Sequence, residues 1–167
     1  MIVACLAVTA MFSTCDKKND DDNGNGDGKF DAKLIGTWTS NGKPLHYRLV
    51  NGKWVLNTGG EQGFGYGYIF NSDGTYIFMI SLTDIAGQYL GTGINRGIFR
   101  TDEDKLILTL RYYDFVSRNR DKDTSNTKTG EEIYYYSFGV KHSGWGEGLI
   151  LQPEDMNISD SFFFPLE

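Results

Sequence analysis

Cysteine is almost absent from this chain. Its two cysteines, Cys5 and Cys15, both lie within the first fifteen residues. The remainder of the chain therefore has no thiol to pair, which excludes a disulfide framework as a source of stability. A domain formed there must be stabilised by its own core, and the stretch of about 135 residues after Lys33 is long enough for one domain.

Clusters of basic residues and long apolar runs are missing as well. The formal net charge is −6, and the sequence has no stripe of Lys and Arg residues. Nucleic acids are therefore not expected as partners, because neutralising phosphates requires a basic face. The longest apolar run, Ile2–Phe12, is too short for a transmembrane helix, which needs roughly 20 apolar residues.

That apolar run instead has the length of the apolar core of an export signal, about 7–15 residues. The residues Phe12-Ser13-Thr14-Cys15 that follow it resemble a lipobox. We therefore expect residues 1–14 to be a lipoprotein signal peptide and Cys15 to carry the lipid that attaches the chain to a membrane. An ordinary cleaved signal peptide with an incidental cysteine is the alternative.

A polar acidic tract follows Cys15. The segment 16–28 has no apolar residue, so residues 15–32 are predicted to form a flexible tether before a domain at 33–167. Asn23, Asn25 and Asp27 copy part of an EF-hand calcium loop, but the twelfth position holds Leu34 in place of the bidentate Glu. No metal site is therefore expected, and a calcium loop is the alternative.

Segments with a two-residue period recur through the domain and predict about nine or ten strands. An Asn51-Gly52 pair between two of them is typical of a type I′ hairpin turn. The polar stretch Ser117–Gly130 is expected to be a loop, and Leu82–Leu90 is the one segment with room for a helical turn. The expected strands are Leu45–Val50, Lys53–Asn57, Gly65–Phe70, Thr75–Ile80, Arg96–Thr101, Lys105–Tyr113, Ile133–Val140, Leu149–Gln152 and Ser161–Pro165.

Short strands joined by hairpins predict an all-β fold, an antiparallel up-and-down barrel of about 8–10 strands. Closing the sheet removes the exposed edges that a long meander otherwise offers to neighbours. A β-sandwich is the alternative, because the strand pattern is the same for both.

Four short motifs occur in order along the domain: Gly36-Thr37-Trp38, then Asp73-Gly74-Thr75-Tyr76, Gly97-x-Phe99 and Leu106-x-Leu108. Together they resemble the small lipocalin-like lipoproteins of Bacteroidetes. The acidic tract after Cys15 is similar to the signal that sends such lipoproteins to the cell surface. The resemblance implies a lipocalin-like barrel held on the outer membrane and exposed at the cell surface.

A catalytic constellation is hard to find, so no enzyme activity and no cofactor are expected. The two histidines, His46 and His142, have no thiol partner. Only the segment 142–148 brings His, Ser and Glu together, and its glycines favour a turn over a site. A pair of carboxylates that meet in space, as in a carbohydrate-active enzyme, is a distant alternative.

Aromatic residues are abundant, with 10 Tyr and 11 Phe, and supply the candidate binding residues. Inward rings would fill the barrel, whereas outward rings could stack on sugars. The expected function is the binding of a small apolar or glycan-derived ligand, with a structural or protein–protein interaction role as the alternative. The candidate ligand-binding residues are Trp38, Tyr68, Tyr76, Phe78, Leu108, Tyr112 and Tyr135.

Overall fold

The computed structural model describes residues 29–56, 65–119, 123–141, 144, 146–154 and 159–166. The expected signal peptide, Cys15 and most of the calcium-loop pattern lie outside these residues. No helix in the described ranges has the length and apolar character needed to cross a membrane. The elements are a short 3-10 helix, η1 (Ala32–Leu34), and the strands β1 (Gly36–Thr39), β2 (Tyr47–Val50), β3 (Lys53–Leu56), β4 (Tyr66–Phe70), β5 (Thr75–Thr83), β6 (Tyr89–Asp102), β7 (Lys105–Ser117), β8 (Thr124–Gly139), β9 (Gly148–Pro153) and β10 (Ser161–Leu166).

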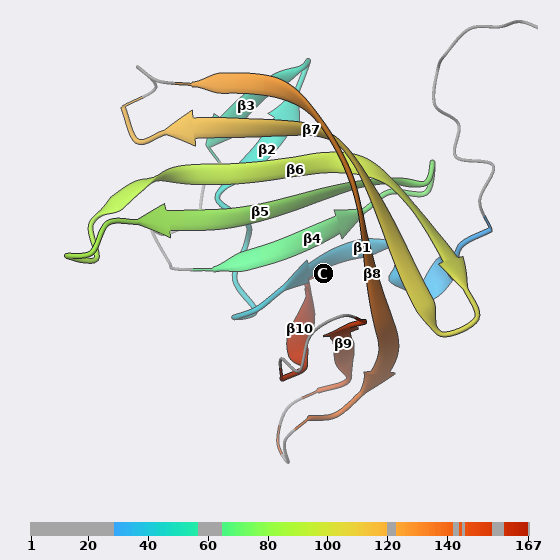
Figure 1. The fold of residues 1–167 in the computed structure, drawn as a ribbon. Coiled ribbons are helices and arrows are strands. Elements are labelled where there is room, and N and C mark those ends of the chain that lie inside the picture. Colours follow the sequence, from blue (N-terminus) through green and yellow to red (C-terminus); the bar gives the residue numbers. More distant parts are fainter. Residues whose placement is uncertain are drawn as a thin grey trace, which may run out of the picture.

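Eight of these strands close into a barrel in the order β1-β10-β9-β8-β7-β6-β5-β4. Each neighbouring pair is antiparallel, and from β4 to β10 every strand pairs with the next one in the chain. Figure 1 shows β8 arching from the broad β4–β7 sheet across to β9. The expected all-β, antiparallel up-and-down barrel is confirmed.

Hairpin turns lie where the turn residues predicted them. Asn51 and Gly52 both have positive φ angles, 49° and 73°, as a type I′ turn between β2 and β3 requires. Gly74, with a φ of 80°, ends the turn between β4 and β5. These turns could be predicted because their geometry depends on local residues alone.

Two expectations about the connections are wrong. Residues Thr124–Gly130, expected in a loop, form the first half of β8 and pair with β7, for instance Ser125 with Asp114. Their side chains are exposed, so the sequence of this segment lacks the apolar alternation by which a strand is predicted. The strand forms because the long β7 is available to pair with it. The segment Leu82–Leu90 forms the end of β5, a turn and the start of β6, where the Asp84 carboxylate accepts hydrogen bonds from two amides of the turn.

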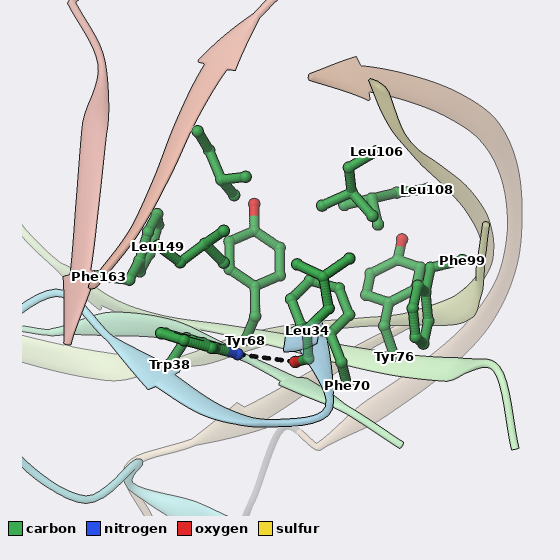
Figure 2. Packing of buried hydrophobic residues seen from close by; sticks show 11 residues of the cluster. Leu34, Trp38, Tyr68, Phe70, Tyr76, Phe99, Leu106, Leu108, Leu149 and Phe163 are labelled. Atoms are coloured by element: carbon green, nitrogen blue, oxygen red, sulfur yellow. Dashed lines mark hydrogen bonds between the residues drawn. The ribbon is translucent and has the colours of Figure 1, made fainter. Parts of the chain in front are cut away.

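The core fills the end of the barrel where the chain enters. Phe30 packs on Phe99 with ring centroids 4.9 Å apart, and Leu34 is fully buried. Figure 2 shows the Trp38 indole nitrogen donating to the Leu34 carbonyl, at 2.8 Å. The buried members of this inner core are Leu34, Trp38, Tyr68, Phe70, Tyr76, Phe99, Leu106, Leu108, Leu149, Leu151 and Phe163.

A second apolar cluster lies on the outer face of the barrel, where the β2–β3 hairpin packs. Leu45 and Tyr47 from the hairpin side are buried with Met79, Ile94 and Val116 of β5–β7. Alternation along each strand explains this arrangement, because residues next to inward-facing ones, such as Met79 beside Phe78, face outward.

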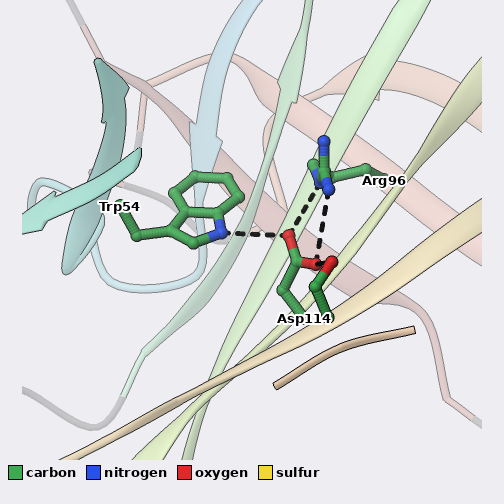
Figure 3. Close-up of polar contacts among 4 residues, drawn as sticks. Trp54, Arg96 and Asp114 are labelled. Atoms are coloured by element: carbon green, nitrogen blue, oxygen red, sulfur yellow. Dashed lines mark hydrogen bonds and ion pairs between the residues drawn. The ribbon is translucent and has the colours of Figure 1, made fainter. Parts of the chain in front are cut away.

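A buried carboxylate fixes the hairpin against the barrel. Asp114 of β7 is 2% exposed and accepts hydrogen bonds from the Trp54 indole, the Arg96 guanidinium and the Ser125 hydroxyl. Figure 3 shows Trp54 of β3 and Arg96 of β6 converging on it. Burial raises the pKa of Asp114, but these hydrogen bonds outweigh it and hold the pKa below its ordinary value.

Candidate functional site

A half-open pocket of about 240 Å³ lies on the inner face of the barrel and borders the packed core. We call it the inner cavity. Its lining comes from β4, β5, β8, β9 and β10, strands far apart in the sequence. The lining residues are Tyr66, Tyr68, Phe78, Ile80, Tyr134, Leu151, Pro153, Ser161 and Phe163.

Strand register explains why aromatic rings gather here. Tyr66 and Tyr68 alternate with outward-facing residues on β4, and they lie opposite Ile80 and Phe78 of β5. Residues directly opposite each other in an antiparallel pair face the same side of the sheet. The two strands thus place aromatic and aliphatic side chains on one continuous inner surface.

The rings hold one another in place. Phe163 of β10 meets Tyr66 and Tyr68 edge-on, with centroid distances of 5.5 and 5.3 Å, and Tyr68 lies 4.6 Å from Phe78. Edge-to-face pairs of this kind are favourable beyond the area they bury. The wall of the inner cavity is therefore preorganised, so a ligand would meet ring faces and edges already in position.

Two tyrosine hydroxyls give this apolar wall a polar part. The Tyr134 hydroxyl donates to the Glu132 carboxylate at 2.8 Å, and Tyr68 lines the same space. Glu132 lies opposite Leu108 in the β7–β8 ladder, so it shares the inner face, and its side chain is exposed.

Burial raises the pKa of these phenols further above the physiological range. It raises the pKa of Tyr134 to about 12, with the Glu132 carboxylate as the next cause, and it raises the pKa of Tyr68 well above its ordinary value. Burial raises the pKa of Tyr76 as well. All three phenols thus remain neutral hydrogen-bonding groups through the physiological pH range.

The structure divides the predicted ligand-binding residues among three environments. Tyr68 and Phe78 line the inner cavity. Trp38, Tyr76 and Leu108 are buried in the inner core, with exposed fractions of 8% or less. Tyr112 and Tyr135 lie on the outer face, 44% and 37% exposed, where they stack against Arg96 and Lys105. The seven residues therefore do not form one site, and Cys15 lies outside the described residues.

Sequence reasoning missed Tyr134 and Glu132. The run Tyr134-Tyr135-Tyr136 signals rings on both faces of a strand, but it does not tell which face points inward. The pairing of Tyr134 with Leu106 decides this, because Leu106 belongs to the inner core. That pairing depends on the register of β7 and β8 and is not encoded locally.

The histidines and acidic residues of the described ranges form no metal site. No group of three or more His, Cys, Asp or Glu is placed there to hold an ion. The His46 ring packs against Tyr47 and Tyr89, and burial lowers its pKa. His142 and Ser143 lie outside the described residues.

Comparison with known proteins gives no match, neither to a family model, nor to a curated protein, nor to a solved structure.

Proposed function

We propose that this protein is a surface-exposed lipoprotein of the outer membrane, anchored through Cys15, whose lipocalin-like barrel binds a small apolar or glycan-derived ligand in the inner cavity. The observation that carries the binding proposal is the cavity itself. About 240 Å³ of space remains among aromatic side chains beside the packed core of the barrel.

The size of the cavity limits the ligand. Its volume lies just below the roughly 300–1,000 Å³ of sites for drug-sized molecules. A single ring, or the terminal ring of a longer chain, suits that space. The faces of Phe78 and Tyr66 provide the apolar contact, and the hydroxyl of Tyr134 provides the orienting hydrogen bond.

A cavity-filling variant tests this proposal. Ile80 lines the inner cavity and is 37% exposed, so Ile80→Trp should place a large ring in the space a ligand needs. Ile85→Trp is the matched control, because Ile85 lies fully exposed in the turn between β5 and β6.

Binding is measured with two probe classes on the full chain: the uncharged fluorophore N-phenyl-1-naphthylamine and a panel of methyl glycosides. We expect saturable binding of at least one class, weakened about tenfold or more by Ile80→Trp and unchanged by Ile85→Trp. Absence of binding by both classes, or equal affinity in the two variants, would contradict the proposal.

A structural or protein-interaction role is the second candidate, and the β2–β3 hairpin favours it. Val50 and Val55 lie on the face of the hairpin that points away from the barrel, and they are 39% and 40% exposed. Two neighbouring apolar side chains in that position suit a protein partner. In this role, Val55→Glu removes the protein from a cell-envelope complex on native gels while the probes bind as before.

A further inference from the structure

A groove on the outer face of the barrel is separate from the inner cavity. We call it the outer groove. It has a volume of about 250 Å³ and lies between the β2–β3 hairpin and the outer face of β5–β7. Its side chains include two arginines, Arg96 and Arg111, and an aromatic ring, Tyr112. The charge of Arg96 is paired with the Asp114 carboxylate beside the groove, so Arg111 contributes the positive charge that no described carboxylate pairs.

A β-bulge gathers these side chains. On β6, Arg96 and Gly97 are consecutive, whereas their partners on β7 are Tyr112 and Leu110, so Arg111 is the extra residue. In a regular strand Arg111 and Tyr112 would face opposite sides, but both line the outer groove. A bulge changes the direction of a side chain and locally disrupts the regular pairing of the strands. Bulges are common beside functional sites.

Arg96 is held in place by its surroundings. The Asp114 carboxylate binds its Nε and Nη2 atoms at 2.8 and 3.3 Å, and its guanidinium lies 5.0 Å from the Tyr112 ring and 5.9 Å from the Trp54 ring. A guanidinium has five N–H donors, so this pairing leaves others for a ligand. Arg96 is therefore an oriented donor with little conformational freedom to lose on binding.

Arg111 differs from Arg96 in its partners. Within the described ranges its side chain has neither an ion pair nor a hydrogen bond, although the residue is partly buried. An arginine that lines a groove without a counter-charge is positioned to pair with an incoming anion. The floor beside it is apolar, formed by Ile77 and Ile98, with Leu49 of the hairpin contributing.

We propose that the outer groove binds a small amphipathic organic anion, with its carboxylate on Arg111 and Arg96 and its apolar body on Ile77, Ile98 and Tyr112. The planar fork of an arginine matches a carboxylate, and the aliphatic floor accommodates a ring or short alkyl chain. This site is separate from the inner cavity, because none of the residues that the structure describes lines both.

The test is an amide-resolved NMR titration of the full chain with phenylacetate, and with phenylacetamide as its uncharged counterpart. We expect phenylacetate to shift the amide signals of residues 96–98 and 110–112 in a saturable way. The affinity for phenylacetamide should be lower by about tenfold or more. Sodium sulfate at the same concentration should compete only partly, because it lacks the apolar body.

Arg111→Gln should weaken phenylacetate binding about fivefold or more and reduce the difference in affinity between phenylacetate and phenylacetamide. Arg111→Lys should retain part of that difference. Arg118→Gln is the matched control, because it removes the same charge from an exposed residue outside the groove and should leave the affinity unchanged. Thermal unfolding of each variant verifies that it is folded.

The proposal is overturned by equal affinity for phenylacetate and phenylacetamide, or by equal effects of Arg111→Gln and Arg118→Gln. It is equally overturned by shifts confined to the inner cavity, by complete competition from sulfate, or by the absence of saturable shifts. None of these results contradicts the proposal for the inner cavity.

Discussion

Trp38 connects the entering segment of the chain to the barrel core. Its ring is 8% exposed, its indole nitrogen donates to the Leu34 carbonyl, and its ring lies 5.7 Å from that of Phe138 on β8. One side chain thus joins η1, β1 and β8. At this scale, stability depends on filling the closed end of the barrel completely.

We expect Trp38→Ala to lower the free energy of unfolding by about 3–5 kcal/mol, because it leaves a cavity the size of an indole ring. Trp38→Phe retains most of the packing and loses the hydrogen bond, so it should cost about 1 kcal/mol in addition to a small packing loss. Denaturant unfolding measures both. Equal stability of Trp38→Ala and the parent chain would show that the closed end does not depend on this ring.

On the outer face, the buried Asp114 side chain joins separate strands through hydrogen bonds, as Trp38 joins elements in the core. Asp114→Asn removes the charge that pairs with Arg96, whose side chain is 30% exposed, so we expect a loss of about 2–3 kcal/mol, less than for a fully buried pair. Glu131→Gln is the control, because it breaks the exposed pair with Arg100 and should cost under about 1 kcal/mol. Equal losses in the two variants would contradict the role assigned to Asp114.

The stabilisation by Asp114 should depend on pH with a defined sign. Its folded-state pKa lies below the ordinary value of 3.8, so the contribution is complete above that value and is lost as the pH falls through the folded-state pKa. We therefore expect the stability difference between the parent chain and Asp114→Asn to be constant from about pH 7 to 5. It should shrink below about pH 4. A difference that grows on acidification would reverse the assignment.

At the scale of elements, the hairpin turns could be predicted and the contacts between hairpins could not. Asn51-Gly52 predicts its turn because the two residues themselves favour positive φ angles. The cluster of Asp114, Arg96 and Trp54 depends on residues up to 60 positions apart and on a bulge at Arg111. Nothing in the local sequence encodes that register.

The first half of β8 is another element that could not be predicted from its local sequence. Thr124–Gly130 has no apolar alternation, since its side chains are exposed, and its strand character comes from pairing with β7. The inner cavity was likewise only partly predictable. Tyr68 and Phe78 follow from strand alternation, whereas the inward position of Tyr134 follows from long-range pairing.

Shortening that connection should therefore destabilise the barrel. Replacing residues 118–130 with Asn-Gly removes the strand that pairs with Tyr112–Phe115, so we expect loss of cooperative unfolding. Replacing residues 84–88 with Asn-Gly is the matched control, because that segment is only the turn between β5 and β6. Circular dichroism during thermal unfolding compares the two. Cooperative unfolding of both variants would mean that this half of β8 is dispensable.

At the scale of the whole molecule, the packed core of the barrel borders a half-open pocket on its inner face. Eleven buried side chains among the described residues form the inner core, and two of them, Tyr68 and Phe163, also line the inner cavity. The hairpin β2–β3 covers part of the outer face, and its Leu49 lines the outer groove. Among the described residues, the inner cavity is thus lined mainly by aromatic side chains, and the outer groove carries two arginines.

The most direct test of the central claim is native mass spectrometry of the intact protein released from its own membrane in detergent. We expect a chain that begins at Cys15 with acyl groups attached, carrying a small molecule that is absent from Ile80→Trp and present in Ile85→Trp. The variant that fills the inner cavity thus links the bound mass to that space. A chain that carries no small molecule, or that carries the same one in Ile80→Trp, would contradict the account.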